Sequence, residues 1–185
     1  KLNKLIENPN KNSLYGILDC GESGNCLFNC IAEALNSNII YNKDYKIISG
    51  QDIRDNISNN ITNDKYRLYL NLYKILKDTN DFDEEWDPYK IKNIDEFKKI
   101  IRDNIWGDNI IISEIINLYK LNIIILESDS NNKIYKIYNY NNYNSNYDSI
   151  ILLYIDKIHF NLVGKFDNRM ITLFKILPIE IKKLI

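Results

Sequence analysis

The reactive residue types of this chain are concentrated in one short segment, residues 21–28, which reads Gly-Glu-Ser-Gly-Asn-Cys-Leu-Phe. Turn-forming residues there lead into an apolar stripe with helical spacing, so we expect a helix over residues 26–35 that begins at Cys26. The first backbone N–H groups of a helix have no partner within it, and the helix dipole adds partial positive charge beside them. A thiol at such a position is activated as a nucleophile, which makes Cys26 a candidate catalytic residue.

The turn before Cys26 is a candidate for binding a negatively charged oxygen. It consists of Ser23, Gly24 and Asn25, and glycine permits backbone conformations that a side chain would forbid. Its N–H groups and those of the helix start can together donate hydrogen bonds to a developing oxyanion. The nucleophile and the oxyanion loop would then come from one segment.

A nucleophilic cysteine needs a base, and the chain contains a single histidine, His159. It lies in an apolar run that predicts a strand over residues 159–163, so its pairing with Cys26 would be spatial rather than sequential. Asn161 follows two residues later and therefore points to the same side of a strand. Its amide oxygen can hold an imidazole N–H and fix the tautomer of the ring.

Simpler interpretations remain open on the residues alone. A cysteine at a helix start is often a small core residue. A single histidine on an apolar strand is likewise often a core residue whose hydrogen bonds are satisfied. We expect Cys20 and Cys30 to be core residues. Alternatively, the three cysteines and the histidine form a zinc site, although no close Cys-x-x-Cys pair supports it.

Length and composition narrow the classes of protein. The chain has 185 residues, of which 45% are apolar and 26% charged, as in globular domains that bury a core. The 24 basic and 25 acidic residues give a net charge of −1, which argues against nucleic-acid binding through phosphate neutralisation. No apolar run approaches the roughly 18 residues that a bilayer-spanning helix needs, so we expect no membrane segment.

The odd cysteine count and the residue bias suggest where the protein works. Three cysteines cannot form a complete disulfide framework, so we expect a reducing, intracellular setting, the cytoplasm. The chain starts at Lys1 without a signal-peptide pattern, and we interpret it as a fragment of a longer product. Ile and Asn are abundant while Val163 is the one valine, a bias that an AT-rich genome, such as that of a large DNA virus, produces.

Hydrophobic periodicity predicts helices first and strands later. Further helices are expected from a cap at Ser49 to Ile61, over the stripe 66–76, from Asp95 to Ile101, and after Gly107 to Leu118. Strands of one sheet are expected at 121–126, 134–138, 150–155 and 159–163. The polar segment 139–149 is interpreted as a hairpin connection or a disordered insert.

This order predicts an α+β (α/β/α-like) fold in which helices flank a small central β-sheet. With no repeat and no linker, we expect a single domain over residues 1–185. The apolar C-terminal extension, residues 165–185, is expected to pack on that domain, with Pro178 as the first residue of a helix.

Taken together, these segments resemble the ovarian tumour (OTU) family of cysteine proteases, which are mainly deubiquitinases. The resemblance covers about residues 17–163, in the family's order. The segment 23–28 resembles the signature Asp-Gly-Asn-Cys-Leu-Phe, and 159–161 resembles the ending His-aromatic-Asn. Three further features lie between these two segments. Residues 51–54 resemble the family's arginine-bearing helix, residues 106–115 its Trp-Gly-x-x-x-Glu-Leu segment, and residues 123–125 the strand that follows.

The resemblance implies a papain-like OTU fold and thiol-dependent hydrolysis of the isopeptide bond after the C-terminal Gly-Gly of ubiquitin. Cys26 would be the nucleophile, His159 the general base and Asn161 its orienter. The loop from Ser23 to Asn25 would bind the oxyanion. No cofactor and no metal is implied. The expected partners are ubiquitin and polyubiquitin conjugates, and no nucleic-acid or membrane partner is expected. We expect the protein to be a monomer.

A substrate channel for the Gly-Gly end is also implied, lined by Phe160 and Trp106, although Trp106 fits a core position equally well. The acidic stretch 81–87 either attracts the basic tail of ubiquitin or is a solvated loop. For a viral protein, the setting would be the host cytoplasm and the process a host–virus interaction.

One departure from the family pattern is Ser23, which stands where the family has Asp. A serine can still accept backbone hydrogen bonds in such a loop. An upstream acid, Asp19 or Glu22, is the alternative to Asn161 as the group that orients His159. The alternatives for function are a catalytically weak OTU-like module that binds ubiquitin, and a protease for another modifier that ends in Gly-Gly.

Overall fold

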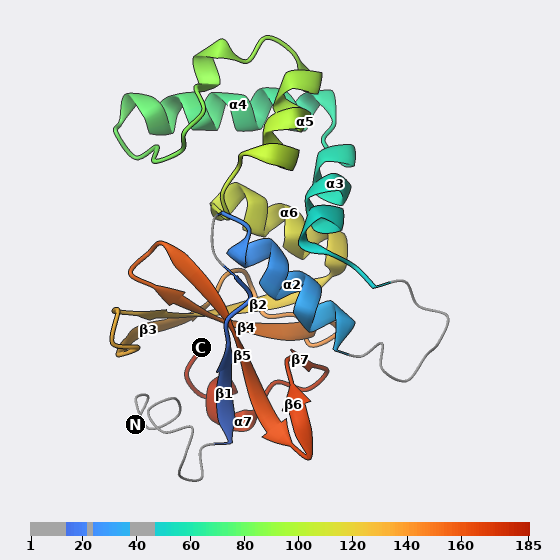
Figure 1. Ribbon diagram of the computed structural model, residues 1–185, viewed down its shortest axis with the longest axis vertical. Helices are drawn as coiled ribbons and strands as arrows, with labels where there is room; N and C mark the ends of the chain where they lie inside the picture. The colour runs from blue at the N-terminus through green and yellow to red at the C-terminus, as the bar shows by residue number, and fades with distance from the viewer. Residues whose placement is uncertain (1–13, 22–23, 38–46) are drawn as a thin grey trace.

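The structure of the chain, a computed structural model, describes residues 14–21, 24–37 and 47–185. Its helices are α2 (Cys26–Asn36), α3 (Gly50–Asn59), α4 (Asn63–Asp78), α5 (Ile94–Asp103), α6 (Asn109–Tyr119) and α7 (Ile179–Lys182), with a 3₁₀ turn η2 (Pro88–Lys90). Its strands are β1 (Tyr15–Leu18), β2 (Leu121–Ser128), β3 (Ile134–Asn139), β4 (Asp148–Ile155), β5 (His159–Asp167), β6 (Arg169–Ile171) and β7 (Leu173–Phe174). Figure 1 shows α3, α4 and α5 stacked away from the sheet, with α2 and α6 between.

Side-chain caps start four of the helices. Ser49 accepts from the backbone N–H of Asp52, whose carboxylate accepts in return from the Ser49 N–H, a capping box for α3. Thr62, Asn93 and Asp108 accept in the same way from N–H groups in the first turns of α4, α5 and α6. The helices that the sequence predicts are therefore confirmed to within a few residues at each end.

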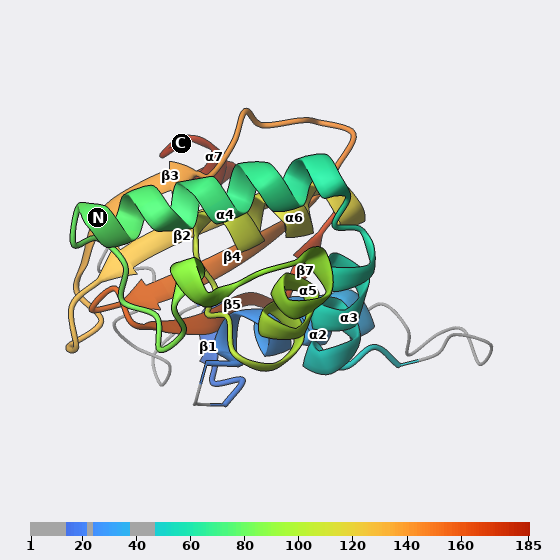
Figure 2. The ribbon, with the colours of Figure 1, turned by 90° about the horizontal axis from the view of Figure 1, so that it is seen from above.

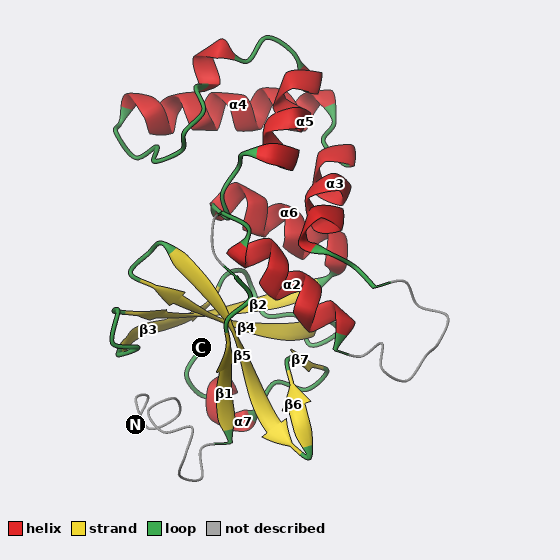
Figure 3. Ribbon diagram, in the orientation of Figure 1, coloured by secondary structure: helices red, strands yellow, loops and turns green. Residues whose placement is uncertain are grey.

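The strands form one mixed sheet in the order β1-β5-β4-β2-β3, with β6 beside β5 and β7 beside β4. Strands β2 and β4 are parallel, and the other pairs are antiparallel. The mixed α/β architecture with helices flanking a central sheet is as predicted (Figure 3). The expectation of a hairpin at 139–149 is wrong, because β4 pairs with β2 and not with β3.

Each face of the sheet is covered by its own apolar cluster. The larger cluster joins the sheet to α2, α3, α5 and α6, and the smaller one lies on the opposite face with α7. Along β5 the side chains alternate, so Phe160 and Leu162 belong to the larger cluster and Val163 to the smaller. His159 and Asn161 share the parity of Val163, and both therefore leave β5 on the side away from Phe160.

Residues after β5 contact both faces of the sheet. Leu173 is buried in the larger cluster, and Phe174, Leu177 and Ile181 are buried in the smaller one. Glu180 on α7 accepts 2.7 Å hydrogen bonds from Tyr15 Oη on β1 and Lys165 Nζ on β5. Pro178 is the residue before the first turn of α7 rather than its first residue.

Seen from above, α4 crosses the molecule on its outer side, over α6 and the sheet (Figure 2). None of the helices in the described ranges has the length and apolarity to span a bilayer.

Candidate active site

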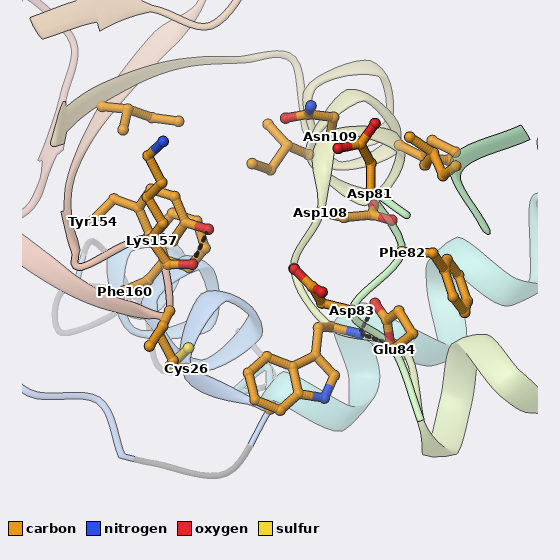
Figure 4. A pocket seen from close by; sticks show the side chains of 18 of the residues that line it. Cys26, Asp81, Phe82, Asp83, Glu84, Asp108, Asn109, Tyr154, Lys157 and Phe160 are labelled. Atoms are coloured by element: carbon orange, nitrogen blue, oxygen red, sulfur yellow. Dashed lines mark hydrogen bonds between the residues drawn. The ribbon is translucent and has the colours of Figure 1, made fainter. Parts of the chain in front are cut away.

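A cleft of about 410 Å³ lies between the sheet and the helical part of the molecule. Figure 4 shows Cys26, Tyr154, Lys157 and Phe160 on one side of it, and acidic residues on the other. The first side comes from the start of α2 and from the turn that joins β4 to β5. The acidic side comes from the segment after α4 and from the residues that lead into α6, so the cleft exists only in the folded chain.

Cys26 is held rigidly at the wall of this cleft. It is the first residue of α2, and only 6% of its surface is exposed. The next two residues, Leu27 and Phe28, are completely buried and anchor the helix start in the larger core cluster. The thiol therefore lines the cleft at the N-terminal end of a helix, where partial positive charge gathers.

His159 and Asn161 form a direct contact on β5. The Nε2 atom of His159 lies 3.0 Å from Oδ1 of Asn161, whereas Oδ1 of Asp19 lies 3.8 Å from the same nitrogen. Because an amide oxygen only accepts hydrogen bonds, this contact places the proton of a neutral imidazole on Nε2. Nδ1 is then the basic nitrogen, available to take a proton from a thiol.

The elements that carry the thiol and the imidazole pack against each other. The Cys30 thiol of α2 donates to the backbone oxygen of Phe160 on β5 at 3.5 Å, and Phe160 lines the same cleft as Cys26. Within the described ranges, no hydrogen bond joins Cys26 directly to His159. Catalytic contacts are often long in an unliganded enzyme and tighten only when substrate binds.

The described part of the predicted oxyanion loop is Gly24 and Asn25, and Ser23 lies outside the described residues. Gly24 has φ +75°, a left-handed conformation that favours glycine. Arg54 on α3 donates to the Gly24 carbonyl at 3.0 Å and to Asn25 Oδ1 at 2.9 Å. The sequence marked Arg54 only as part of a family pattern, without this contact.

Trp106 and Phe160, the predicted channel residues, both line the cleft but differ in accessibility. Trp106 is 41% exposed, and its indole ring approaches Gly24, whereas Phe160 is buried and stacks on Tyr154 with 4.2 Å between the ring centroids. The following Gly107 permits this arrangement, because a Cβ there would lie 2.5 Å from Leu27 Cδ2.

The acidic stretch is divided between the cleft and the core. Asp81 and Asp83 are exposed at the cleft opposite Cys26 (Figure 4), while Trp86 is buried. Glu84 accepts the backbone N–H of Trp106 through both carboxylate oxygens, at 3.0 and 3.2 Å. The stretch is therefore more than a solvated loop, since part of it builds the wall that carries Trp106.

Glu84 is also an unusual acid. The pKa of Glu84 is raised to about 7, chiefly by burial and also by the nearby charge of Asp108, while the Trp106 N–H and the charge of Arg54 act in the opposite direction. Burial likewise raises the pKa of Asp108, the cap of α6. The sequence marked Glu84 only as part of the acidic stretch 81–87 and did not mark Asp108, because burial of a loop carboxylate leaves no local pattern.

Replacing Glu84 with Gln is expected to change how stability depends on pH. A carboxyl whose pKa is higher in the folded state than in the unfolded state destabilises the fold as pH rises between the two values, here from 4.5 to about 7. At about 1.4 kcal/mol per pKa unit, the charged form costs up to about 3 kcal/mol at pH 8. Urea unfolding at pH 5 and pH 8 should show a smaller difference for Glu84→Gln than for the wild type. If the difference in unfolding free energy between pH 5 and pH 8 is the same for Glu84→Gln and the wild type, the raised pKa of Glu84 is contradicted.

The zinc alternative has no geometric support in the described ranges, where no group of three or more Cys, His, Asp or Glu side chains is arranged to hold a metal ion. Cys30 is fully buried, and Cys20 is half-buried with its thiol 3.7 Å from the Leu18 carbonyl. The three cysteines of the described chain are free thiols.

Comparison with known proteins gives one family and several structures of the same fold. The OTU-like cysteine protease profile matches residues 22–161. An OTU deubiquitinase from Wolbachia pipientis wMel has a TM-score of 0.52 at 13% identity, covering 82% of this chain and 88% of the other. An OTU domain in complex with ubiquitin has a TM-score of 0.48 at 18% identity, covering 91% of this chain and 78% of the other. The viral OTU domain protease of Qalyub virus has a TM-score of 0.46 at 14% identity, covering 82% of this chain and 85% of the other. No curated protein matches the chain in sequence.

Proposed function

Because the chain belongs to the OTU-like cysteine proteases, we propose that it is a deubiquitinase, with Cys26, His159 and Asn161 as its catalytic residues. The reaction is hydrolysis of the isopeptide bond after the C-terminal Gly-Gly of ubiquitin, in conjugates or in polyubiquitin chains. The similar Wolbachia structure is described as an OTU deubiquitinase, and the proposal gives this chain the same activity.

The proposal is carried by the 3.0 Å His159–Asn161 contact on β5, because Phe160, the residue between them, lines the cleft that contains the helix-start Cys26. In the first step, His159 Nδ1 takes the Cys26 proton and the thiolate attacks the glycine carbonyl. The loop from Ser23 to Asn25 and the start of α2 stabilise the oxyanion. His159 then protonates the leaving amine, and water, deprotonated by His159, releases ubiquitin from the thioester.

The geometry favours Asn161 over Asp19 as the orienting group, and Glu22, the other upstream acid, lies outside the described residues. Asn161 lies within hydrogen-bond distance of Nε2, whereas Asp19 is at 3.8 Å and exposed. Asp19 is then too far from Nε2 to fix the orientation of the ring by a hydrogen bond.

The two sides of the cleft suggest how the substrate tail is received. We propose that Trp106 and Phe160 enclose the Gly-Gly end and that Asp81 and Asp83 attract the basic residues before it. We further propose that residues 165–185 belong to the same catalytic domain, since their buried residues complete the smaller core cluster. The viral origin and the intracellular setting stay predictions from composition.

The test is reaction with ubiquitin that carries a C-terminal electrophile, followed by intact mass. The wild type and Cys20→Ala should each gain the mass of one ubiquitin, whereas Cys26→Ala should gain none. Parallel reactions with other Gly-Gly modifiers define specificity. A folded wild type that forms no adduct but binds unmodified ubiquitin would replace the proposal with the binding module.

A further inference from the structure

Asn25 differs from the four residues that cap α3, α4, α5 and α6 with their side chains. Ser49, Thr62, Asn93 and Asp108 have extended ψ angles between 165° and −176°, and each side chain accepts a hydrogen bond from its own helix. Asn25 has φ −100° and ψ −4°, and its side chain does not cap α2. Asn is among the best capping residues, so another interaction must compete for its side chain.

That interaction comes from Arg54, which enters from α3. Its Nε donates to Asn25 Oδ1 at 2.9 Å, and one terminal nitrogen donates to the Gly24 carbonyl at 3.0 Å. The other terminal nitrogen donates to the Ile101 carbonyl at 2.8 Å, and the guanidinium carbon lies 3.9 Å above the centre of the Phe28 ring. Arg54 is 3% exposed, so its planar fork is fixed by the core on every side.

The charge of Arg54 makes these contacts strong enough to displace a cap. Burial lowers the pKa of Arg54 to about 10, opposed by the nearby charges of Glu84 and Asp103, so the group stays cationic at neutral pH. Hydrogen bonds from a charged donor are roughly twice as strong as those between neutral groups. A cap donated by a neutral backbone N–H is therefore weaker than the charged N–H bond that Asn25 Oδ1 accepts from Arg54.

We propose that Arg54 is a positioning residue for catalysis, which withholds the Asn25 side chain from the start of α2 and thereby fixes the turn before Cys26. The proposal rests on the proposed function, because the turn is the oxyanion loop of that mechanism. Without Arg54, Asn25 caps α2 as the other four residues cap their helices. Its ψ then turns from near 0° to the extended region, and the Gly24 peptide moves relative to the thiol.

The experiment is a double-mutant cycle on cleavage of a fluorogenic ubiquitin substrate, with Arg54→Met, Asn25→Ala and the double variant. Arg54→Met should lower kcat by about 10–100-fold, the cost of losing oriented oxyanion donors, with a smaller change in KM. Asn25→Ala alone should lower kcat modestly, because Arg54 loses an acceptor. The double variant should be faster than Arg54→Met by about fivefold, because alanine removes the competing cap.

Arg102→Met is the matched control, since it removes an arginine whose Nε contacts Ser58 Oγ between α5 and α3, away from the loop. Its kcat should stay near that of the wild type, and adding Asn25→Ala to it should not raise kcat. If Arg54 matters only for stability, Asn25→Ala will not rescue Arg54→Met, and that result overturns the proposal.

A crystal structure of Arg54→Met gives a readout independent of activity. Asn25 should have an extended ψ, with its side-chain oxygen on the backbone N–H of Leu27 or Phe28. An unchanged Gly24–Asn25 turn would refute the positioning role even if the wild type hydrolyses ubiquitin. A wild type without activity, combined with the displaced turn in Arg54→Met, would instead refute the deubiquitinase and leave the role of Arg54 in the loop intact.

Discussion

Alanine at either Cys26 or His159 is expected to lower kcat for ubiquitin cleavage by at least about 10³-fold, because each removes a group that acts covalently or by proton transfer. The two losses should not add in a Cys26→Ala/His159→Ala variant, since nucleophile and base act as one unit. The fold should tolerate the His159 change, as 27% of that side chain is exposed. Steady-state kinetics and circular dichroism of the three variants test both statements.

The orienting residues should produce smaller, graded effects. Asn161→Ala loses the 3.0 Å contact with Nε2, so kcat should fall by about 10–100-fold through loss of the productive tautomer. Asp19→Asn should change kcat by less than about threefold, because its oxygen is 3.8 Å away and screened by solvent. The reverse order would assign the orienting role to Asp19, and a small effect of His159→Ala would refute the mechanism.

The second large effect concerns stability and comes from Glu114 on α6. Its carboxylate is completely buried, accepts a 2.8 Å hydrogen bond from Lys65 Nζ and a further one from the hydroxyl of Tyr69, and so joins α6 to α4. Lys65→Met leaves this charge without its cation. Removing one partner of a buried pair typically costs about 3–5 kcal/mol, and since the Lys65 side chain is 34% exposed we expect about 2–3 kcal/mol.

Replacing both partners should restore much of that loss. The Lys65→Met/Glu114→Met variant lacks both charges of this pair. Its urea-unfolding midpoint should lie between those of the wild type and Lys65→Met, or above both. Lys77→Met removes the ion pair between Lys77 and Asp87, both of which are partly exposed, and it should cost clearly less stability than Lys65→Met. A Lys65→Met variant as stable as Lys77→Met would mean that Glu114 is satisfied without the lysine.

Strands β2, β3, β4 and β5 and the long helices could be predicted from the sequence because their signals are local, whereas β1, β6 and β7 were not predicted, because two to four residues show too short an alternation. The stripe over 66–76 specifies a helix wherever the rest of the chain lies, and Ser49 with Asp52 caps its helix within four residues. The alternation of a strand likewise places His159 and Asn161 on one face, which is why their contact could be anticipated.

The pairing of the strands and the course of the loop before β4 were decided by the tertiary structure, because both depend on which distant segments come into contact. Asn122, fully buried in β2, donates to the carbonyls of Asn144 and Tyr147 and accepts from the Asn144 N–H, so a polar loop read as a hairpin or a disordered insert is held against a parallel strand pair.

The surroundings of Cys26 show the same division. Its position at a helix start could be predicted from the spacing of apolar residues around it. The hold of Arg54 on the preceding turn, and the raised pKa of Glu84 across the cleft, follow from burial and from hydrogen bonds over 20 or more residues. A local sequence pattern cannot predict these interactions, because they form only when packing brings distant residues together.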